Sequence, residues 1–106
     1  MIVETKKGKL PVRFGMNALA QFGDLTGKSM NEVMSCLNSL GDLKITELLA
    51  LIYVGFMDGA RWAKEDCKIT GTDEIGDMID EDGELINKMF KAFNGDGKQD
   101  GDSKKK

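Results

Sequence analysis

The chain has 106 residues, of which 41% are hydrophobic and 31% are charged, and its formal net charge is −3. This length predicts one domain with one modest core, and the acidic balance excludes a protein that binds nucleic acid through broad positive charge. Two cysteines are too few for a disulfide scaffold. The longest apolar run, residues 48–57, is about half the length that crosses a membrane.

Charge is distributed unevenly along the chain. Residues 1–13 carry a net charge of +3, whereas residues 65–102 hold twelve acidic residues and only four lysines. We therefore expect neither a nucleic-acid nor a membrane partner. Because the N-terminus does not resemble a signal peptide, we expect a cytoplasmic protein whose cysteines are free thiols.

The first predicted element is a β-hairpin with strands over residues 2–5 and 10–14. Gly8 can supply the positive φ that a tight turn needs. Pro11 lacks an amide donor, so it is expected at an edge or an unpaired position. Since a two-stranded hairpin is marginal in water, it is expected to pack on helices.

Two short helices are predicted next. The first covers residues 16–22, and Gly23 is expected to end it. Its inward face is expected to hold the apolar residues spaced three and four apart, which are Met16, Leu19, Ala20 and Phe22. Ser29 and Glu32 then form a capping-box pattern for a second helix that ends at Gly41.

The longest predicted helix runs from Thr46 to about Asp66. Its first half is apolar on nearly all sides, which indicates a helix enclosed by other elements. In its second half, Trp62 and Ala63 are expected to face inward. Gly55 and Gly59 form a GxxxG pattern, which is expected to admit a neighbouring helix or an aromatic side chain.

Two further helices are predicted near the C-terminus. Thr72 or Asp73 is expected to cap one, and residues 84–93 form the other. From residue 94 the composition is typical of disorder. The predicted fold is mainly α, an N-terminal β-hairpin packed on a bundle of about four to five helices. It forms a single domain over residues 1–93, followed by a disordered polar tail over residues 94–106.

No catalytic or metal-binding pattern is found. The run Asp80–Gly83 resembles part of a calcium loop, but aligning Gly83 with the turn glycine places Met78 and Met89 at two ligand positions. There is no histidine and no Gly-rich phosphate loop. No catalytic residue, metal ligand or cofactor is predicted, and the chain is not expected to be an enzyme.

The last helix has an apolar stripe that either docks on the domain or binds a partner helix. The candidate partner-binding residues lie on this stripe and on the preceding helix: Met78, Leu85, Ile86, Met89, Phe90 and Phe93. Most methionines are expected to fill the core, and the alternative role is an adaptable binding surface, which their flexible side chains suit.

The segment LPVRFGMNALAQFGDLTGKS, Leu10–Ser29, and the Leu-rich run LLALIYVGFMDGA resemble the tail assembly chaperones of long-tailed bacteriophages and prophages. The residues that carry the resemblance are Arg13-Phe14-Gly15-Met16, Ala18-Leu19, Phe22 and Leu25-Thr26-Gly27. The resemblance covers residues 2–63, and the acidic C-terminal third matches only in being acidic and helical.

This resemblance implies a protein that binds the tape-measure protein and keeps it soluble until tail-tube subunits polymerise around it. Such a protein works in the host bacterial cytoplasm and is not expected in the mature virion. A longer frameshifted product that recruits tail-tube protein is also implied. Lys104–Lys106 suit a slippery codon run, with a solubilising tail as the alternative. Self-association into a homo-oligomer is left open.

The second functional hypothesis is a small non-enzymatic adaptor or regulatory interaction module. Gene neighbourhood separates the two hypotheses, because a chaperone gene should lie between the genes for the tube and tape-measure proteins.

Overall fold

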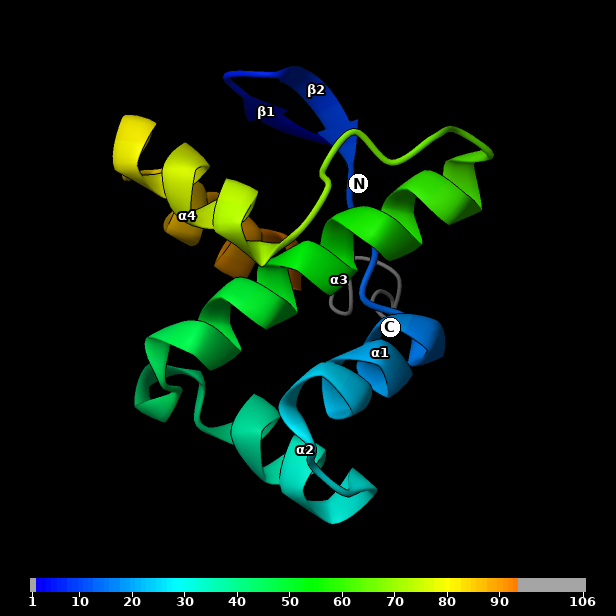
Figure 1. Cartoon of the computed structure of the whole chain (residues 1–106), viewed down its shortest axis with the longest axis vertical. Coiled ribbons are helices and arrows are strands. Elements are labelled where there is room, and N and C mark those ends of the chain that lie inside the picture. The colour runs from blue at the N-terminus through cyan, green and yellow to red at the C-terminus, as the bar shows by residue number, and fades with distance from the viewer. Residues whose placement is uncertain (1, 94–106) are drawn as a thin grey trace, which may run out of the picture.

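The computed structural model of the chain describes residues 2–93. The predicted polar tail, residues 94–106, lies outside these residues. The predicted mainly α fold with an N-terminal hairpin is confirmed (Figure 1). The elements are β1 (Ile2–Thr5), β2 (Gly8–Pro11), α1 (Met16–Thr26), α2 (Met30–Asn38), the 3-10 turn η1 (Leu40–Asp42), α3 (Ile45–Ala63) and α4 (Thr72–Glu81). Residues 85–93 form a last helical segment.

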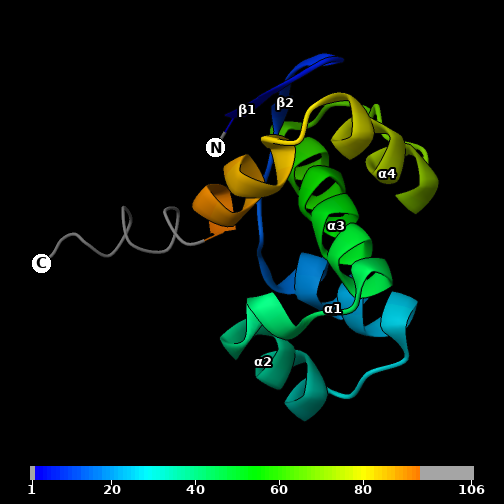
Figure 2. The same cartoon turned by 90° about the vertical axis from the view of Figure 1, so that its left-hand side faces the viewer.

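Helix α3 lies at the centre of the molecule, as its apolar sequence predicts. Figure 1 shows α1 and α2 on one side of it, α4 on another and the hairpin towards its C-terminal end. Figure 2 shows the segment 85–93 across α3 from α4. Buried residues follow one another from Ala50 to Ala60 with few gaps, so the middle of α3 is enclosed by other elements.

The core has two parts that share α3. The larger part joins the hairpin, α3, α4 and the last segment through Val3, Leu10, Val12, Ile52, Phe56, Ile69, Ile75, Met78, Leu85, Met89 and Ala92. The smaller part joins α1, α2 and α3 through Ala18, Phe22, Val33, Ala50, Leu51 and Val54. Phe14 packs against both parts, so the segment between β2 and α1 ties them together.

The predicted hairpin forms, but its second strand is Gly8–Pro11 and not residues 10–14, so Gly8 begins this strand opposite Thr5. Val3 pairs with Leu10, and Ile2 pairs with Pro11 at the open end of the antiparallel ladder. Gly8 has φ of 110°, a conformation that glycine adopts without a Cβ clash. The Val3 and Leu10 side chains are both buried, so the hairpin packs on the helices through one face.

Helix α1 is longer than predicted. It passes through Gly23, which is buried, and ends only where Gly27 adopts a left-handed conformation. The expectation that Gly23 ends the helix is wrong because this glycine lets the chain turn back closely: a Cβ there would lie 3.1 Å from the Lys28 carbonyl oxygen. The inward face is also shifted, since Ala18 is buried while Met16 and Ala20 are exposed.

The capping box of α2 is confirmed. The Ser29 backbone N–H donates to Glu32 Oε1 at 2.8 Å, and the Glu32 N–H donates to Ser29 Oγ at 3.3 Å. Val33 is buried on this helix. Met30 and Met34 on the same helix are 53% and 45% exposed.

Gly55 admits an aromatic side chain, as predicted, whereas Gly59 admits backbone and neither a helix nor an aromatic ring. A Cβ on Gly55 would lie 2.5 Å from Cζ of Phe14, and one on Gly59 would lie 2.5 Å from the Val12 backbone nitrogen. The neighbours are therefore an aromatic ring and the backbone at the end of the hairpin. The Arg13 N–H also donates to the Gly55 carbonyl oxygen at 3.0 Å, which fixes this segment along α3.

Two predictions at helix ends are wrong. Trp62 is 67% exposed, and Ala63 is also exposed, because α3 runs past the core before Lys64 ends it in a left-handed conformation. Helix α4 has Gly71 as its N-cap without a side-chain hydrogen bond, so neither Thr72 nor Asp73 caps it.

Candidate functional site

The predicted partner-binding stripe docks on the domain. Met78, Leu85 and Met89 are 4%, 1% and 1% exposed, and they belong to the larger part of the core. They pack in the same cluster as residues of the hairpin and α3, so these three side chains offer no surface to a partner in this fold. Ile86, Phe90 and Phe93 are half-buried. Partner binding through them stays a prediction.

Phe93 illustrates how the last segment is held. Its ring meets the Phe14 ring edge to face, with centroids 5.2 Å apart and an interplanar angle of 75°. Such pairs stabilise packing beyond the area that they bury. The end of the described chain is thereby joined to the segment between β2 and α1.

Large exposed apolar side chains lie instead on α1, α2 and the two ends of α3. They are Met16, Leu25, Met30, Met34, Ile45 and Trp62, and Ile2 on the hairpin is a further exposed apolar residue. Met30 and Met34 are one turn apart on α2, so they project from the same face. Since both methionine side chains are flexible, this face can adapt to the shape of a partner.

Asp58 is the most unusual polar residue of the described chain, because it lies in the middle of the apolar α3 and is only 2% exposed. Its Oδ1 accepts a hydrogen bond from Arg61 Nη2 at 2.7 Å. Its Oδ2 accepts from Arg13 Nη1 at 3.2 Å and from the Gly15 N–H at 3.0 Å. A buried carboxylate is tolerated when it is paired and hydrogen-bonded in this way.

This network fixes the entry of the chain into α1. Gly15 is the N-cap of that helix and has no side chain of its own to cap it, so Asp58 binds a backbone N–H at the helix start. A Cβ on Gly15 would lie 3.0 Å from Asp58 Oδ2. The Arg13 guanidinium lies 4.2 Å from the centroid of the Trp62 ring, which holds the exposed indole in place by a cation–π contact.

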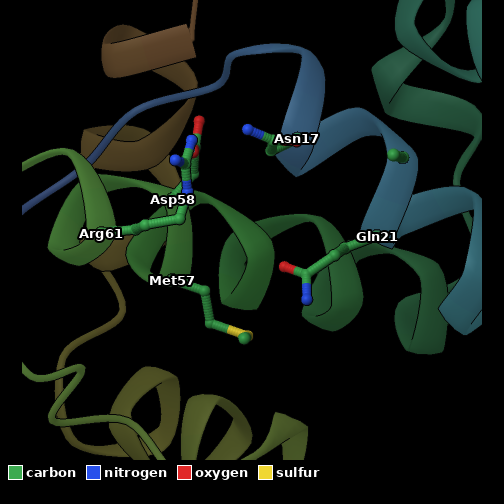
Figure 3. Close-up of a pocket in the computed structure, with 6 residues that line it drawn as sticks. Asn17, Gln21, Met57, Asp58 and Arg61 are labelled. Carbon is green, nitrogen blue, oxygen red and sulfur yellow. The ribbon is translucent and has the colours of Figure 1, made fainter.

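A hollow of about 440 Å³ opens beside Asp58, between α1 and α3. It is lined by Asn17, Ala20, Gln21, Met57, Asp58 and Arg61. Figure 3 shows Asn17 and Gln21 on α1 facing Met57, Asp58 and Arg61 on α3. We call it the arginine hollow. Its lining combines amide groups, a guanidinium and the Asp58 carboxylate with an apolar thioether.

Three ion pairs are formed by lysines on the surface. Lys7–Glu74 and Lys28–Glu47 join elements that are distant in the sequence, whereas Lys88–Asp82 joins residues six positions apart. In each pair, a hydrogen bond from the lysine is the main cause of a lowered pKa of the carboxyl group. The hydrogen bond with Glu47 raises the pKa of Lys28 in turn. All three pairs are open to solvent, which screens them. They position elements and mark no reactive group.

Metal and redox sites have no support in the part of the chain that the structure describes. No group of three or more histidine, cysteine or acidic residues there could hold a metal ion. Cys36 and Cys67 are free cysteines, and the Cys67 thiol donates to the Ile69 carbonyl oxygen at 3.5 Å. Within residues 2–93, no helix combines the length and the apolar character needed to span a bilayer.

No protein-family model, curated protein or solved structure matches this chain. Its functional assignment therefore depends on the residues and on the surfaces described above.

Sequence reasoning missed the arginine hollow. A signal was available, since Asp58 is the first charged residue after a run of ten apolar or glycine residues. A lone acid following such a run indicates a buried partner. Arg13 lies 45 positions away, however, and no helical or strand periodicity connects the two residues.

Proposed function

We propose that this chain is a tail assembly chaperone, which binds the tape-measure protein of a long-tailed phage or prophage and keeps it soluble before the tail tube forms. It would act in the host cytoplasm and remain outside the mature virion, with the tail-tube protein as a second partner. The proposal starts from the resemblance of Leu10–Ser29 to such chaperones.

The residues that carry the resemblance have identifiable roles in this fold. Phe14 fills the space beside Gly55, and Arg13 and Gly15 bind Asp58. Gly27 ends α1 in a left-handed conformation. The segment therefore specifies a scaffold, and these contacts are consistent with a shared scaffold among such chaperones.

The observation that carries the functional proposal is the set of exposed apolar side chains on α1, α2 and the ends of α3. A tape-measure protein presents long amphipathic helices before assembly, and their apolar faces favour aggregation. Leu25, Met30 and Met34 offer apolar contacts without a deep pocket, which suits the docking of a partner helix. Binding alone performs this task, so the proposal includes no catalytic step and no cofactor.

An adaptor or regulatory module is the second candidate, because the same surface would serve any helical partner. The position of the gene separates the two candidates. A location between the genes for the tube and tape-measure proteins supports the chaperone, and a location away from phage structural genes supports the adaptor.

Co-expression with the tape-measure protein of the same genome should raise the soluble yield of that protein. A Met30→Ser/Met34→Ser variant should lose much of this gain, since it removes two exposed apolar contacts from α2. An Ile2→Ser variant is the matched control, because Ile2 is an exposed apolar residue on the hairpin, at the other end of the molecule from α2 (Figure 1). Unchanged yield with the wild-type chain, and no co-purification, would contradict the proposal.

A further inference from the structure

We propose that the arginine hollow binds an acidic side chain on an amphipathic helix of a protein partner. The inference rests on the proposed function in taking this helix to be part of the tape-measure protein. It adds a specific polar contact to the non-directional apolar contacts described above, and it places that contact between α1 and α3.

The arginines beside Asp58 carry more positive charge than the carboxylate neutralises. Two guanidinium groups, those of Arg13 and Arg61, share the single carboxylate of Asp58, so the cluster keeps one uncompensated positive charge. Neither arginine forms an ion pair with another acid within residues 2–93. The Arg61 side chain is 54% exposed, and a guanidinium has five N–H donors, so donors of Arg61 remain available to a carboxylate from outside.

Two side-chain amides lie opposite Arg61 in the hollow. Asn17 and Gln21 are four residues apart on α1, and both line the hollow. Neither side chain has a hydrogen-bond partner among the described residues. Their NH₂ groups can donate to a carboxylate that Arg61 also binds, and hydrogen bonds to a charged acceptor are stronger than neutral ones.

Apolar side chains surround these hydrogen-bond donors. Met57 and Ala20 line the same hollow, and Trp62 is exposed next to Arg61 on α3 and in contact with Arg13. Tryptophan, arginine and methionine are enriched where proteins bind one another. A partner helix with one acid between apolar residues can place its carboxylate at Arg61 and its apolar side chains on Met57 and Trp62.

A nucleic-acid phosphate is a weaker fit to the same donors. Binding to a nucleic acid depends on many neutralised phosphates, whereas the cluster of Arg13, Asp58 and Arg61 has one spare positive charge and the whole chain has a net charge of −3. The partner chemistry that the site favours is therefore a protein carboxylate.

Trp62 provides the measurement, because it is the one tryptophan of the chain. The full chain is titrated with a designed amphipathic helical peptide that carries leucines on one face and one central glutamate. A second peptide has glutamine in place of that glutamate. We expect a change in Trp62 emission and binding of the glutamate peptide about tenfold tighter than the glutamine peptide.

Two variants test the assignment to Arg61. Arg61→Gln should reduce the preference for glutamate to less than about twofold, whereas Lys91→Gln, which removes an exposed positive charge outside the hollow, should leave it unchanged. Circular dichroism checks that both variants fold. Equal binding of the two peptides, an unchanged preference in Arg61→Gln, or tighter binding of a single-stranded oligonucleotide than of the glutamate peptide would each overturn the inference.

The same variants separate this inference from the proposed function. If the wild-type chain and Arg61→Gln solubilise the tape-measure protein equally well, the inference fails and the proposed function stands. If the wild-type chain does not solubilise that protein, but its preference for the glutamate peptide depends on Arg61, the proposed function fails and the carboxylate site stands.

Discussion

Replacing Asp58 by alanine should lower the free energy of unfolding by about 3 kcal/mol. The change removes the acceptor of three hydrogen bonds, from Arg13, Arg61 and the Gly15 N–H. The two guanidinium groups are partly exposed, so water relieves some of the loss. The Gly15 N–H loses its capping acceptor at the start of α1, and a cavity remains beside α3. Urea denaturation followed by circular dichroism measures the change.

Asp80→Ala is the matched control for this prediction. Asp80 is an exposed acid on α4, and surface substitutions of this kind usually change stability by no more than about 0.5 kcal/mol. An Asp58→Ala variant as stable as Asp80→Ala would show that the buried network contributes nothing net, and the account of how α1 is positioned would be wrong.

Replacing Gly59 by alanine should lower the free energy of unfolding by about 2 kcal/mol. The new Cβ would overlap the backbone of Pro11 and Val12. That backbone cannot move freely, because Pro11 ends a paired strand and the Arg13 N–H is bonded to the Gly55 carbonyl oxygen. The hairpin must therefore shift away from α3, which thermal denaturation detects as a lower Tm.

Gly76→Ala, on α4, should instead raise the free energy of unfolding. Its Cβ would lie 3.8 Å from Leu49 Cδ1, an ordinary contact, so the gain in helix propensity should raise stability by about 0.5–1 kcal/mol. If Gly59→Ala is as stable as the wild-type chain, the close approach of the hairpin to α3 is wrong.

Local patterns in the sequence were sufficient for most of the fold. Gly8 with its positive φ next to the hairpin turn, the Ser29–Glu32 capping box and the apolar middle of α3 each depend on residues close together in the chain. The prediction for Gly23 failed because helix propensity alone does not show how the chain folds back after the helix. Glycine disfavours a helix on average, but here its lack of a side chain leaves room for the Lys28 carbonyl oxygen, and the Lys28 N–H donates to the Gly23 carbonyl oxygen at 3.0 Å.

The candidate site was harder to predict than the fold. Periodicity identified the apolar side of residues 84–93, but it cannot show whether another element covers that side. Met89 is buried because the hairpin and α3 meet there, whereas Met30, with equal apolar character, is exposed. The Arg13–Asp58 contact spans 45 positions and arises only when the hairpin packs on α3.

Trp62, at the end of α3, is a second case in which the sequence pattern does not show whether another element covers an apolar side chain. Its size and apolar character predict burial, yet α3 extends beyond the core at this point. The Arg13 guanidinium then covers one face of the ring and leaves the rest exposed. A residue that sequence reasoning assigned to the core thus becomes part of the surface beside the arginine hollow.

The central claim, that this chain binds a tape-measure protein, is tested most directly by purifying the two proteins together. The full chain and the tape-measure protein of the same genome are co-expressed, and the soluble fraction is analysed by size-exclusion chromatography with light scattering. The account predicts one co-eluting complex, whose mass exceeds that of the tape-measure protein by a whole number of chains. Elution of the chain by itself, with the tape-measure protein aggregated or eluting separately, would contradict it.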